Sequence, residues 1–348
     1  MVVVGVTGYP FSGKSKLMEL VAKYTNLERV EDRIVVKVPD RRLERLAQIY
    51  RPKKVTPIEM EFVEVGSVEP GEDKGNAKTF SLLQEVDTVL IVLRAFENPS
   101  VPPVEESPAE QLKTILGVFK ERDLLIIRGR VERLENSKRK LSEVEEYELN
   151  VLKKVLDHFG KERTLRGLEM KEEEWKFVRG FSLMDLKPKV ALVNTGEDGD
   201  YPGKEELLSL AEDEGIDTVE MNVGLASELL ELDEEERKVF MEEYGLEGVD
   251  IEPLMRKIMR ASRLMTFFTA GEKEVRAWEL REGSTALDAA ATIHTDIARG
   301  FIRAEVFSFE DIDREGSEKA LKEKGLIRVV GKDYVVRDGD VIYIRFNV

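Results

Sequence analysis

The chain of 348 residues contains no cysteine and only two histidines, His158 and His294. The missing cysteines exclude disulfides, thiol nucleophiles and cysteine-ligated zinc, and two histidines are too few for a histidine-rich metal site. No run approaches the roughly 18 apolar residues that a membrane-spanning helix needs, and no signal-peptide pattern precedes the first apolar run. We therefore expect a cytoplasmic protein without a membrane partner, in which both histidines are structural.

The chain has fewer basic than acidic residues, with 54 Lys and Arg against 70 Asp and Glu. Its formal net charge is therefore −16. This balance argues against a protein that grips nucleic acid along its whole surface, because phosphates would be repelled. A local basic patch is still compatible with it. The apolar fraction of 42% and the length indicate a folded protein of two or three domains.

A complete phosphate-binding motif, G-x-x-x-x-G-K-S, lies close to the N-terminus. It consists of Gly8, Tyr9, Pro10, Phe11, Ser12, Gly13, Lys14 and Ser15. An apolar run precedes it and a helix-like pattern follows it, which is the context that such a P-loop requires. Backbone N–H groups and the helix N-terminus would face the phosphates, Lys14 would reach them, and Ser15 would ligate Mg²⁺. The alternative is a glycine turn that binds nothing.

Six short apolar runs, several of them separated by helical patterns, predict the strands of a doubly wound α/β sheet. Loops that carry the chemistry are then expected at the carboxyl ends of the strands. The runs are residues 2–6, 34–38, 58–65, 88–93, 189–193 and 217–221.

The middle of the chain, residues 107–186, predicts an antiparallel helical arm inserted into this sheet domain. Two capping boxes, Ser107 with Glu110 and Ser142 with Glu145, open helices with narrow apolar stripes. Residues 135–137 form a plausible turn between them. Dense charge around the stripes favours a projecting hairpin over two helices packed on the core.

The last 85 residues alternate between short apolar runs and turn signals, which indicates a small α+β domain. One helix is expected around residues 286–294. Strands are expected at residues 275–280, 302–306, 326–330, 334–336 and 341–346.

Two segments that follow predicted strands are candidates for contacts with the base of a nucleotide. The first contains Asn194, Thr195 and Glu197, where many GTPases carry N-K-x-D. Glu197 is one methylene longer than that Asp, so the paired guanine contact loses selectivity. The second segment is Asn222, Val223 and Gly224. The alternative is that Asn194 only begins a turn.

Several stretches resemble the YchF/Obg-like ATPase family of P-loop proteins, and together they cover nearly the whole chain. The most specific ones lie near the C-terminus and are similar to the family's TGS domain, a β-grasp, ubiquitin-like module. The stretches are residues 52–57, 226–229, 266–271, 273–278, 294–296, 299–306, 331–334 and 346–348.

The resemblance implies a Ras-like P-loop NTPase domain at residues 1–106 and 187–263, interrupted by a helical coiled-coil arm at 107–186 and followed by the TGS domain at 264–348. It implies ATP preference through Asn194 and Glu197, Mg²⁺ as the metal, slow hydrolysis without a catalytic Gln, and association with ribosomes or translation components.

The chain departs from this family at both switch regions. Glu64 stands where switch II carries Asp, and Ser67 stands where it carries Gly. Switch I is shortened, Thr25 is the only threonine there and is expected to end the helix, and Lys16 replaces the usual Thr after the P-loop. Glu64 is a candidate metal ligand beside Ser15, with a shifted geometry. Weak sensing of the γ-phosphate is expected, because that contact is what orders switch I.

Two kinds of function follow from this mixture of intact and altered motifs. The intact P-loop favours a slow ATPase that works by positioning and Mg²⁺ electrostatics. The altered switches favour a nucleotide-binding or nucleotide-free adaptor that acts as an RNA or ribosome interaction module. A GTP-binding protein is the third possibility, since Asn194 can contact any purine.

Four arginines of the TGS-like segment, Arg276, Arg281, Arg299 and Arg303, are candidates for an RNA-binding or partner-binding patch. Trp278 and Phe301 lie near them in the sequence, as base stacking would require. The alternative is that the aromatic side chains belong to the core and the arginines form surface ion pairs.

Overall fold

A computed structural model describes residues 1–25, 32–71, 73–197, 199–244 and 249–347. Most of the shortened switch I segment, residues 26–31, lies outside these ranges. Thr25 is the C-cap of the helix that follows the P-loop, as expected. Among the described helices, none is both long enough and apolar enough to cross a membrane.

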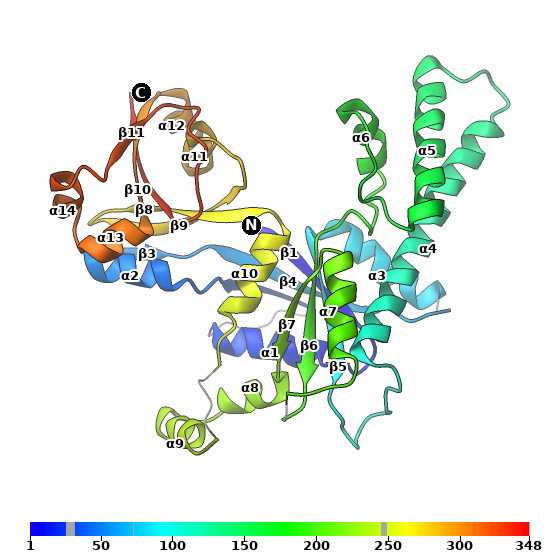
Figure 1. Cartoon of the computed structure of the whole chain (residues 1–348), viewed down its shortest axis with the longest axis horizontal. Coiled ribbons are helices and arrows are strands. Elements are labelled where there is room, and N and C mark those ends of the chain that lie inside the picture. Colours follow the sequence, from blue (N-terminus) through cyan, green and yellow to red (C-terminus); the bar gives the residue numbers. More distant parts are fainter. Residues whose placement is uncertain (26–31, 72, 198, 245–248, 348) are drawn as a thin grey trace.

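A six-stranded sheet forms the N-terminal layer, in the order β2-β4-β1-β5-β6-β7 (Figure 1). β2 is antiparallel to β4, and the other neighbours are parallel. All six apolar runs are strands, and the doubly wound P-loop NTPase fold is confirmed. The strands are β1 (Val2–Gly8), β2 (Arg33–Lys37), β4 (Glu59–Ser67), β5 (Thr88–Ala95), β6 (Lys189–Thr195) and β7 (Asp217–Met221).

Helices cover both faces of this sheet, because successive strand residues point to opposite sides. Leu90 and Val92 of β5 belong to one apolar core, and Val89 and Ile91 belong to the other. The first core includes α1 (Lys14–Tyr24), α8 (Val223–Leu229) and α10 (Glu252–Ala261). The second includes α3 (Asp73–Glu85), the first half of α4 and α7 (Lys204–Asp213). A further helix, α9 (Glu234–Tyr244), follows α8.

The predicted helical arm projects from the sheet domain as α4 (Pro108–Glu135) and α5 (Glu143–Glu162), with α6 (Glu172–Arg179) beside α5 (Figure 1). Both predicted capping boxes are present, with Glu110 N and Glu145 N each donating to its capping serine. The arm has an apolar core of its own, which includes Phe159.

A buried carboxylate fastens the base of the arm. Asp123 of α4 is fully buried, and it accepts hydrogen bonds from Met184 N at 3.0 Å and Asp185 N at 2.8 Å. Residues 184 and 185 lie where the chain returns to the sheet domain. Since a buried carboxylate needs such partners, these bonds hold the outgoing and returning segments of the arm together.

A second six-stranded sheet, β11-β10-β12-β8-β9-β3, forms the C-terminal unit. The segment 334–336 is not a strand, contrary to the prediction, and Val335 forms only an isolated bridge to Thr285. The segment lies beside residues 284–286 through two backbone bonds, from Ala286 N to the Tyr334 carbonyl oxygen and from Val336 N to the Ser284 carbonyl oxygen. Tyr334 Oη and Arg337 N both donate to Asp340 Oδ2 at 2.9 Å. The elements are β8 (Leu264–Ala270), β9 (Glu274–Arg281), α11 (Ala286–Ile293), α12 (Thr295–Arg299), β10 (Phe301–Ser308), α13 (Phe309–Glu315), α14 (Glu318–Glu323), β11 (Arg328–Val330) and β12 (Asp340–Phe346).

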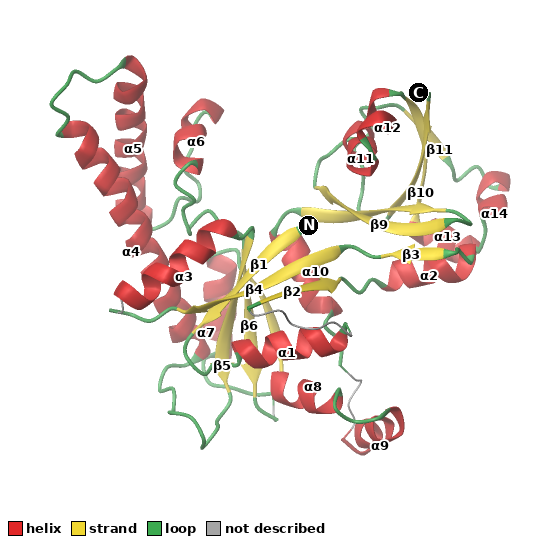
Figure 2. Cartoon of the chain, turned by 180° about the vertical axis from the view of Figure 1, so that it is seen from behind, coloured by secondary structure: helices red, strands yellow, loops and turns green. Residues whose placement is uncertain are grey.

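The N-terminal part of the chain supplies one strand and one helix to this C-terminal unit (Figure 2). The strand β3 (Lys54–Thr56) pairs in parallel with the edge strand β9, and α2 (Arg41–Tyr50) packs near it. One continuous apolar core joins Leu43 and Leu46 of α2 to Phe268 of β8. Residues 41–56 were expected to belong to the nucleotide domain alone, and the domain limits stay a prediction.

Arg42 of α2 forms one of the polar links across this contact. Its guanidinium pairs with Asp40 at 2.8 Å and with Asp338 at 2.6 Å, and it lies over the Phe268 ring. The Arg42 side chain is only 23% exposed, whereas its neighbour Arg41 is 76% exposed and pairs with Asp250.

We expect Arg42→Ala to lower the free energy of unfolding by about 2–3 kcal/mol, because it leaves the largely buried Asp40 carboxylate without its ionic partner and removes the bond to Asp338. Arg41→Ala, the matched control, should cost less than about 1 kcal/mol, because Arg41 is 76% exposed and its buried partner Glu252 keeps an ion pair with Arg256. Urea denaturation of both variants measures the difference. Equal losses would mean that the Arg42 contacts do not hold the two units together.

Candidate phosphate-binding site

The loop of residues 8–13 links β1 to α1. It contains two glycines, and substitution of either by another residue would strain the backbone. Gly8 has φ 149°, and a Cβ there would lie 2.2 Å from the Val92 carbonyl oxygen. Gly13 has φ 98°, and a Cβ there would lie 2.3 Å from Asn194 Nδ2. Both conditions favour glycine alone. The loop backbone therefore runs tightly between β5 and the end of β6.

Lys14 is buried beneath the loop, with 7% of its surface exposed. Its Nζ donates to the Tyr9 carbonyl oxygen at 2.7 Å and to Ser67 Oγ at 3.0 Å. Burial lowers the pKa of Lys14 to about 8, although the nearby carboxylates of Glu64 and Glu69 act in the opposite direction. The ammonium group is thus directed at the carboxyl end of β4.

Ser15 also faces the end of β4, and its Oγ donates to Glu64 Oε1 at 2.7 Å. A hydroxyl and a carboxylate side by side supply oxygen ligands, which Mg²⁺ prefers, and this ion usually completes its shell with water and phosphate oxygens. No cluster of three or more metal-ligating side chains occurs in the described ranges. The pair therefore suits a metal that is shared with a bound phosphate.

Other members of the loop differ in their environment. Ser12 is fully buried, and its Oγ has no hydrogen-bond partner among the described residues. The Phe11 side chain is 55% exposed. Its backbone φ is 58°, a conformation that residues other than glycine rarely adopt. Pro10 is half-buried, and Lys16 lies on the exposed side of α1 near Glu19.

Asn194 at the end of β6 joins three parts of the site. Its Nδ2 donates to the Ser12 carbonyl oxygen at 3.1 Å, and its Oδ1 accepts from Val223 N at 3.1 Å. The side chain is 4% exposed. The position of Asn194 at the site follows from the sequence, but its role as a clamp between the P-loop and α8 does not.

The other residues predicted to contact the base lie at the end of β6 and at the start of α8. Thr195 is buried in β6, and Glu197 is exposed beyond it. Asn222 caps α8, with its Oδ1 accepting from Leu225 N at 2.9 Å. Gly224 follows in the first turn of that helix.

Two contacts of this site were not predicted. The first is the bond from Lys14 to Ser67, although the sequence placed Ser67 at the end of β4. The second is a set of bonds that shapes the loop after β5. The Gln111 side chain bonds to the backbone N–H and carbonyl oxygen of Arg94, and Arg94 Nη1 donates to the Pro102 carbonyl oxygen at 2.8 Å. A buried charge at the end of an apolar strand is the sequence signal that marks Arg94.

The four candidate arginines of the C-terminal unit do not form one patch. Arg276 and Arg281 lie on β9 and at its end, whereas Arg303 lies on β10, and β12 and β8 separate the two strands. Arg299 ends α12 and is exposed, as is Arg303. Trp278 and Phe301 pack against the apolar core rather than standing free, and the Arg276 guanidinium covers the Trp278 ring.

Both histidines lie outside the loop's contacts. His158 Nε2 is 3.2 Å from the Arg166 carbonyl oxygen on the arm, and His294 caps α12. These contacts agree with the structural roles expected for them.

Comparison with known proteins gives consistent matches. Residues 264–347 match the family described as "YchF-GTPase_C: Protein of unknown function (DUF933)". The chain is 35% identical over 358 residues to "Ribosome-binding ATPase YchF" of Pasteurella multocida, covering 99% of both chains. It is 32% identical to "Obg-like ATPase 1" of Oryza sativa, covering 99% of this chain and 92% of that one.

Solved structures show the same fold. The "Structure of the Schizosaccharomyces pombe YchF GTPase" superposes with a TM-score of 0.83 at 24% identity, covering 99% of this chain and 97% of that chain. A "GTP binding protein from Pyrococcus horikoshii OT3" gives a TM-score of 0.61 at 16% identity, with 99% of each chain covered. The full-length identity to curated relatives establishes the relationship: the chain belongs to the YchF/Obg-like ATPase family.

Proposed function

We propose that the protein binds a purine nucleoside triphosphate with Mg²⁺ at the P-loop. One observation carries this proposal: Lys14 and Ser15 both direct their polar atoms at the end of β4, toward Ser67 and Glu64. A buried ammonium beside a hydroxyl and a carboxylate is an arrangement that receives phosphate and its metal together.

Each group has a distinct task in this proposal. Backbone N–H groups of the loop and the N-terminus of α1 hold the phosphate oxygens. Lys14 neutralises their charge, and Ser15 and Glu64 hold the Mg²⁺ ion. When bound, Mg²⁺ neutralises the developing charge on the phosphate oxygens. Asn194 keeps the loop in register with the segment that contacts the base.

ATP is the nucleotide that we propose, with GTP as the alternative. Glu197 replaces the short carboxylate that would accept both guanine donors, and this favours adenine. Asn222, Val223 and Gly224 supply backbone near the base. The names of the two curated relatives, both ATPases, support the same choice.

We propose that hydrolysis is slow or absent. The reason is that the Ser67 hydroxyl accepts a hydrogen bond from Lys14 at a position where the family has glycine. Single-turnover assays with labelled Mg²⁺-ATP test this point. Hydrolysis that depends on Lys14 supports a slow ATPase. No product above the level of Lys14→Ala supports a binding protein that has lost the reaction.

A ribosome or another translation-associated RNA assembly is the partner that we propose for the arm and the TGS domain. The support is the name of the curated relatives, "Ribosome-binding ATPase YchF". Arg299 and Arg303, both exposed, are the arginines best placed for RNA. Co-sedimentation with ribosomes tests this association, and unchanged binding by Lys14→Ala would favour the adaptor alternative.

Removal of the Ser67 hydroxyl is expected to tighten ATP binding about three- to tenfold, because the bond to Lys14 no longer has to be broken, a gain of about 1 kcal/mol. Isothermal titration of Ser67→Gly and Ser67→Ala measures the effect. Both variants should behave alike if the hydroxyl is the cause. Weaker binding by both would show instead that the hydroxyl contacts the ligand.

A further inference from the structure

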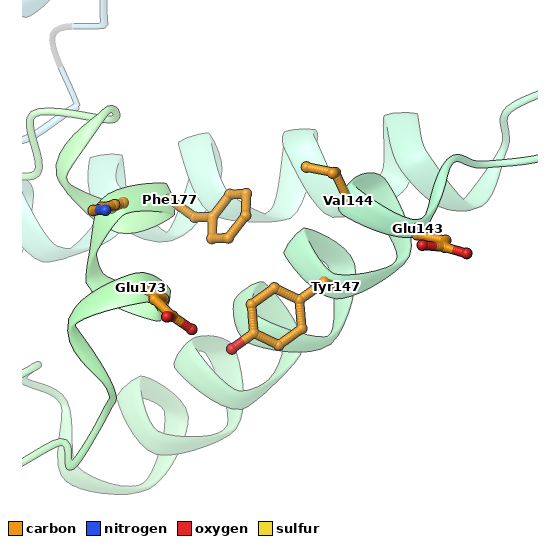
Figure 3. A pocket seen from close by; sticks show the side chains of 6 residues that line it. Glu143, Val144, Tyr147, Glu173 and Phe177 are labelled. Atoms are coloured by element: carbon orange, nitrogen blue, oxygen red, sulfur yellow. The ribbon is translucent and has the colours of Figure 1, made fainter.

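An open apolar groove lies on the helical arm between α5 and α6 (Figure 3). Its volume is about 410 Å³, which accommodates one or two large side chains. It lies toward the free end of the arm, away from the P-loop (Figure 1). The lining residues are Glu143, Val144, Tyr147, Glu173, Lys176 and Phe177.

Three apolar side chains form the floor of this groove. Val144 is 64% exposed and Tyr147 is 39% exposed, on a helix whose opposite face is buried in the arm's core. Phe177 of α6 meets Tyr147 edge to face, with ring centroids 5.8 Å apart. Figure 3 shows these side chains directed into the space between the two helices. Exposed apolar side chains gathered in a hollow mark an interaction site more often than scattered ones do.

Carboxylates without ionic partners border this floor. Glu143 and Glu173 form no ion pair with any described residue, whereas their neighbours Glu145 and Glu172 pair with Arg139 and Arg179. The rim carries one cation, Lys176, so the groove is acidic overall. A partner with positive charge around an apolar anchor complements both the floor and the rim.

We propose that this groove binds a basic protein segment that inserts one or two apolar side chains between α5 and α6. Val144, Tyr147 and Phe177 bury the apolar side chains, and Glu143 and Glu173 pair with flanking Lys or Arg. RNA is the disfavoured occupant, because its phosphates would meet uncompensated carboxylates. Binding at this groove does not require a bound nucleotide. The groove proposal and the P-loop proposal can therefore fail independently of each other.

Titration of the full chain with a fluorescein-labelled 12-residue peptide, two leucines flanked by arginines, tests the proposal. Two control peptides replace the arginines by glutamate or the leucines by serine. The protein variants are Tyr147→Ser and the pair Glu143→Gln with Glu173→Gln. The charge-matched control is Glu132→Gln with Glu162→Gln, two exposed arm residues outside the groove.

We expect saturable binding of the basic peptide alone, weakened at least tenfold by Tyr147→Ser and at least fivefold by the groove carboxylate pair, with no change in the control pair. Thermal melts and ATP binding equal to those of the parent chain show that the variants are folded. No saturable binding at about 1 mM, or equal binding by all variants, would overturn the proposal. Tighter binding of a single-stranded RNA after neutralisation of Glu143 and Glu173 would assign the groove to RNA instead.

Discussion

Replacement of Lys14 by alanine is expected to weaken Mg²⁺-ATP binding about 100-fold, a loss of about 3 kcal/mol. The Lys14 ammonium is buried and held by Tyr9 and Ser67, so it is already positioned for a phosphate oxygen. No other cation takes its place in the loop, since Lys16 lies on the exposed side of α1. Lys16→Ala is the control and should retain ATP affinity within about threefold. Isothermal titration of the parent chain, Lys14→Ala and Lys16→Ala measures the effect.

The same lysine predicts a pH dependence of binding. Burial lowers the pKa of Lys14 to about 8, so the free protein loses the Lys14 proton as the pH rises through this value. Affinity for ATP should be constant from about pH 6.5 to 7.5 and then fall by up to about tenfold per pH unit. Lys14→Ala should remove this dependence. An identical slope in the variant would assign the pH dependence to another group.

The stability of the ligand-free protein should change in the opposite direction with pH. Between pH 8 and the ordinary lysine pKa of 10.5, the unfolded chain keeps the Lys14 proton that the folded chain has lost. Because the unfolded state then binds more protons, the contribution of Lys14 to stability rises with pH in this window. Denaturant titrations of the parent chain and Lys14→Ala isolate that contribution.

Gly13→Ala is expected to lower the free energy of unfolding by about 2–4 kcal/mol and to weaken ATP binding at least tenfold. The left-handed backbone at φ 98° is strained for alanine, and the new Cβ would meet Asn194 Nδ2 at 2.3 Å. Displacement of Asn194 would break the clamp between the P-loop and α8. Denaturant melts and ATP titrations measure the two effects.

Gly283→Ala is the matched control for backbone strain. Gly283 has φ 80°, but a Cβ there would meet no atom within 4 Å. This variant should cost only about 1 kcal/mol and leave ATP binding unchanged. If both variants lost the same stability and Gly13→Ala bound ATP normally, the close approach to Asn194 would have no functional role.

Local sequence signals were sufficient for most of the fold. The central runs, such as those of β1, β5 and β6, became strands because buried parallel strands need continuous apolar residues. The edge strand β2 is antiparallel and alternates between buried and exposed residues. Both capping boxes began helices at the predicted serines. The segment 334–336 was predicted as a strand from its two adjacent valines, but it forms only an isolated bridge, and the Tyr334 hydroxyl and Arg337 N donate to the Asp340 side chain. Periodicity alone does not contain such side-chain bonds.

Contacts between distant segments were not predictable. β3 has only three residues, and its partner Glu274 lies far along the chain from Lys54. The sequence motifs placed Lys14, Asn194 and Ser67 near one site, but the bond of Lys14 to Ser67 and that of Asn194 to the Ser12 carbonyl oxygen depend on how the strand ends meet. Sequence order therefore gave the members of the site, and the packing of the sheet determined which of them touch.

Equilibrium binding of ATP and GTP to the purified full chain with Mg²⁺ tests the central claim most directly. We predict saturable binding of ATP, weaker binding of GTP, and loss of both in Lys14→Ala. If neither nucleotide bound at about 1 mM, the phosphate-site proposal would be contradicted.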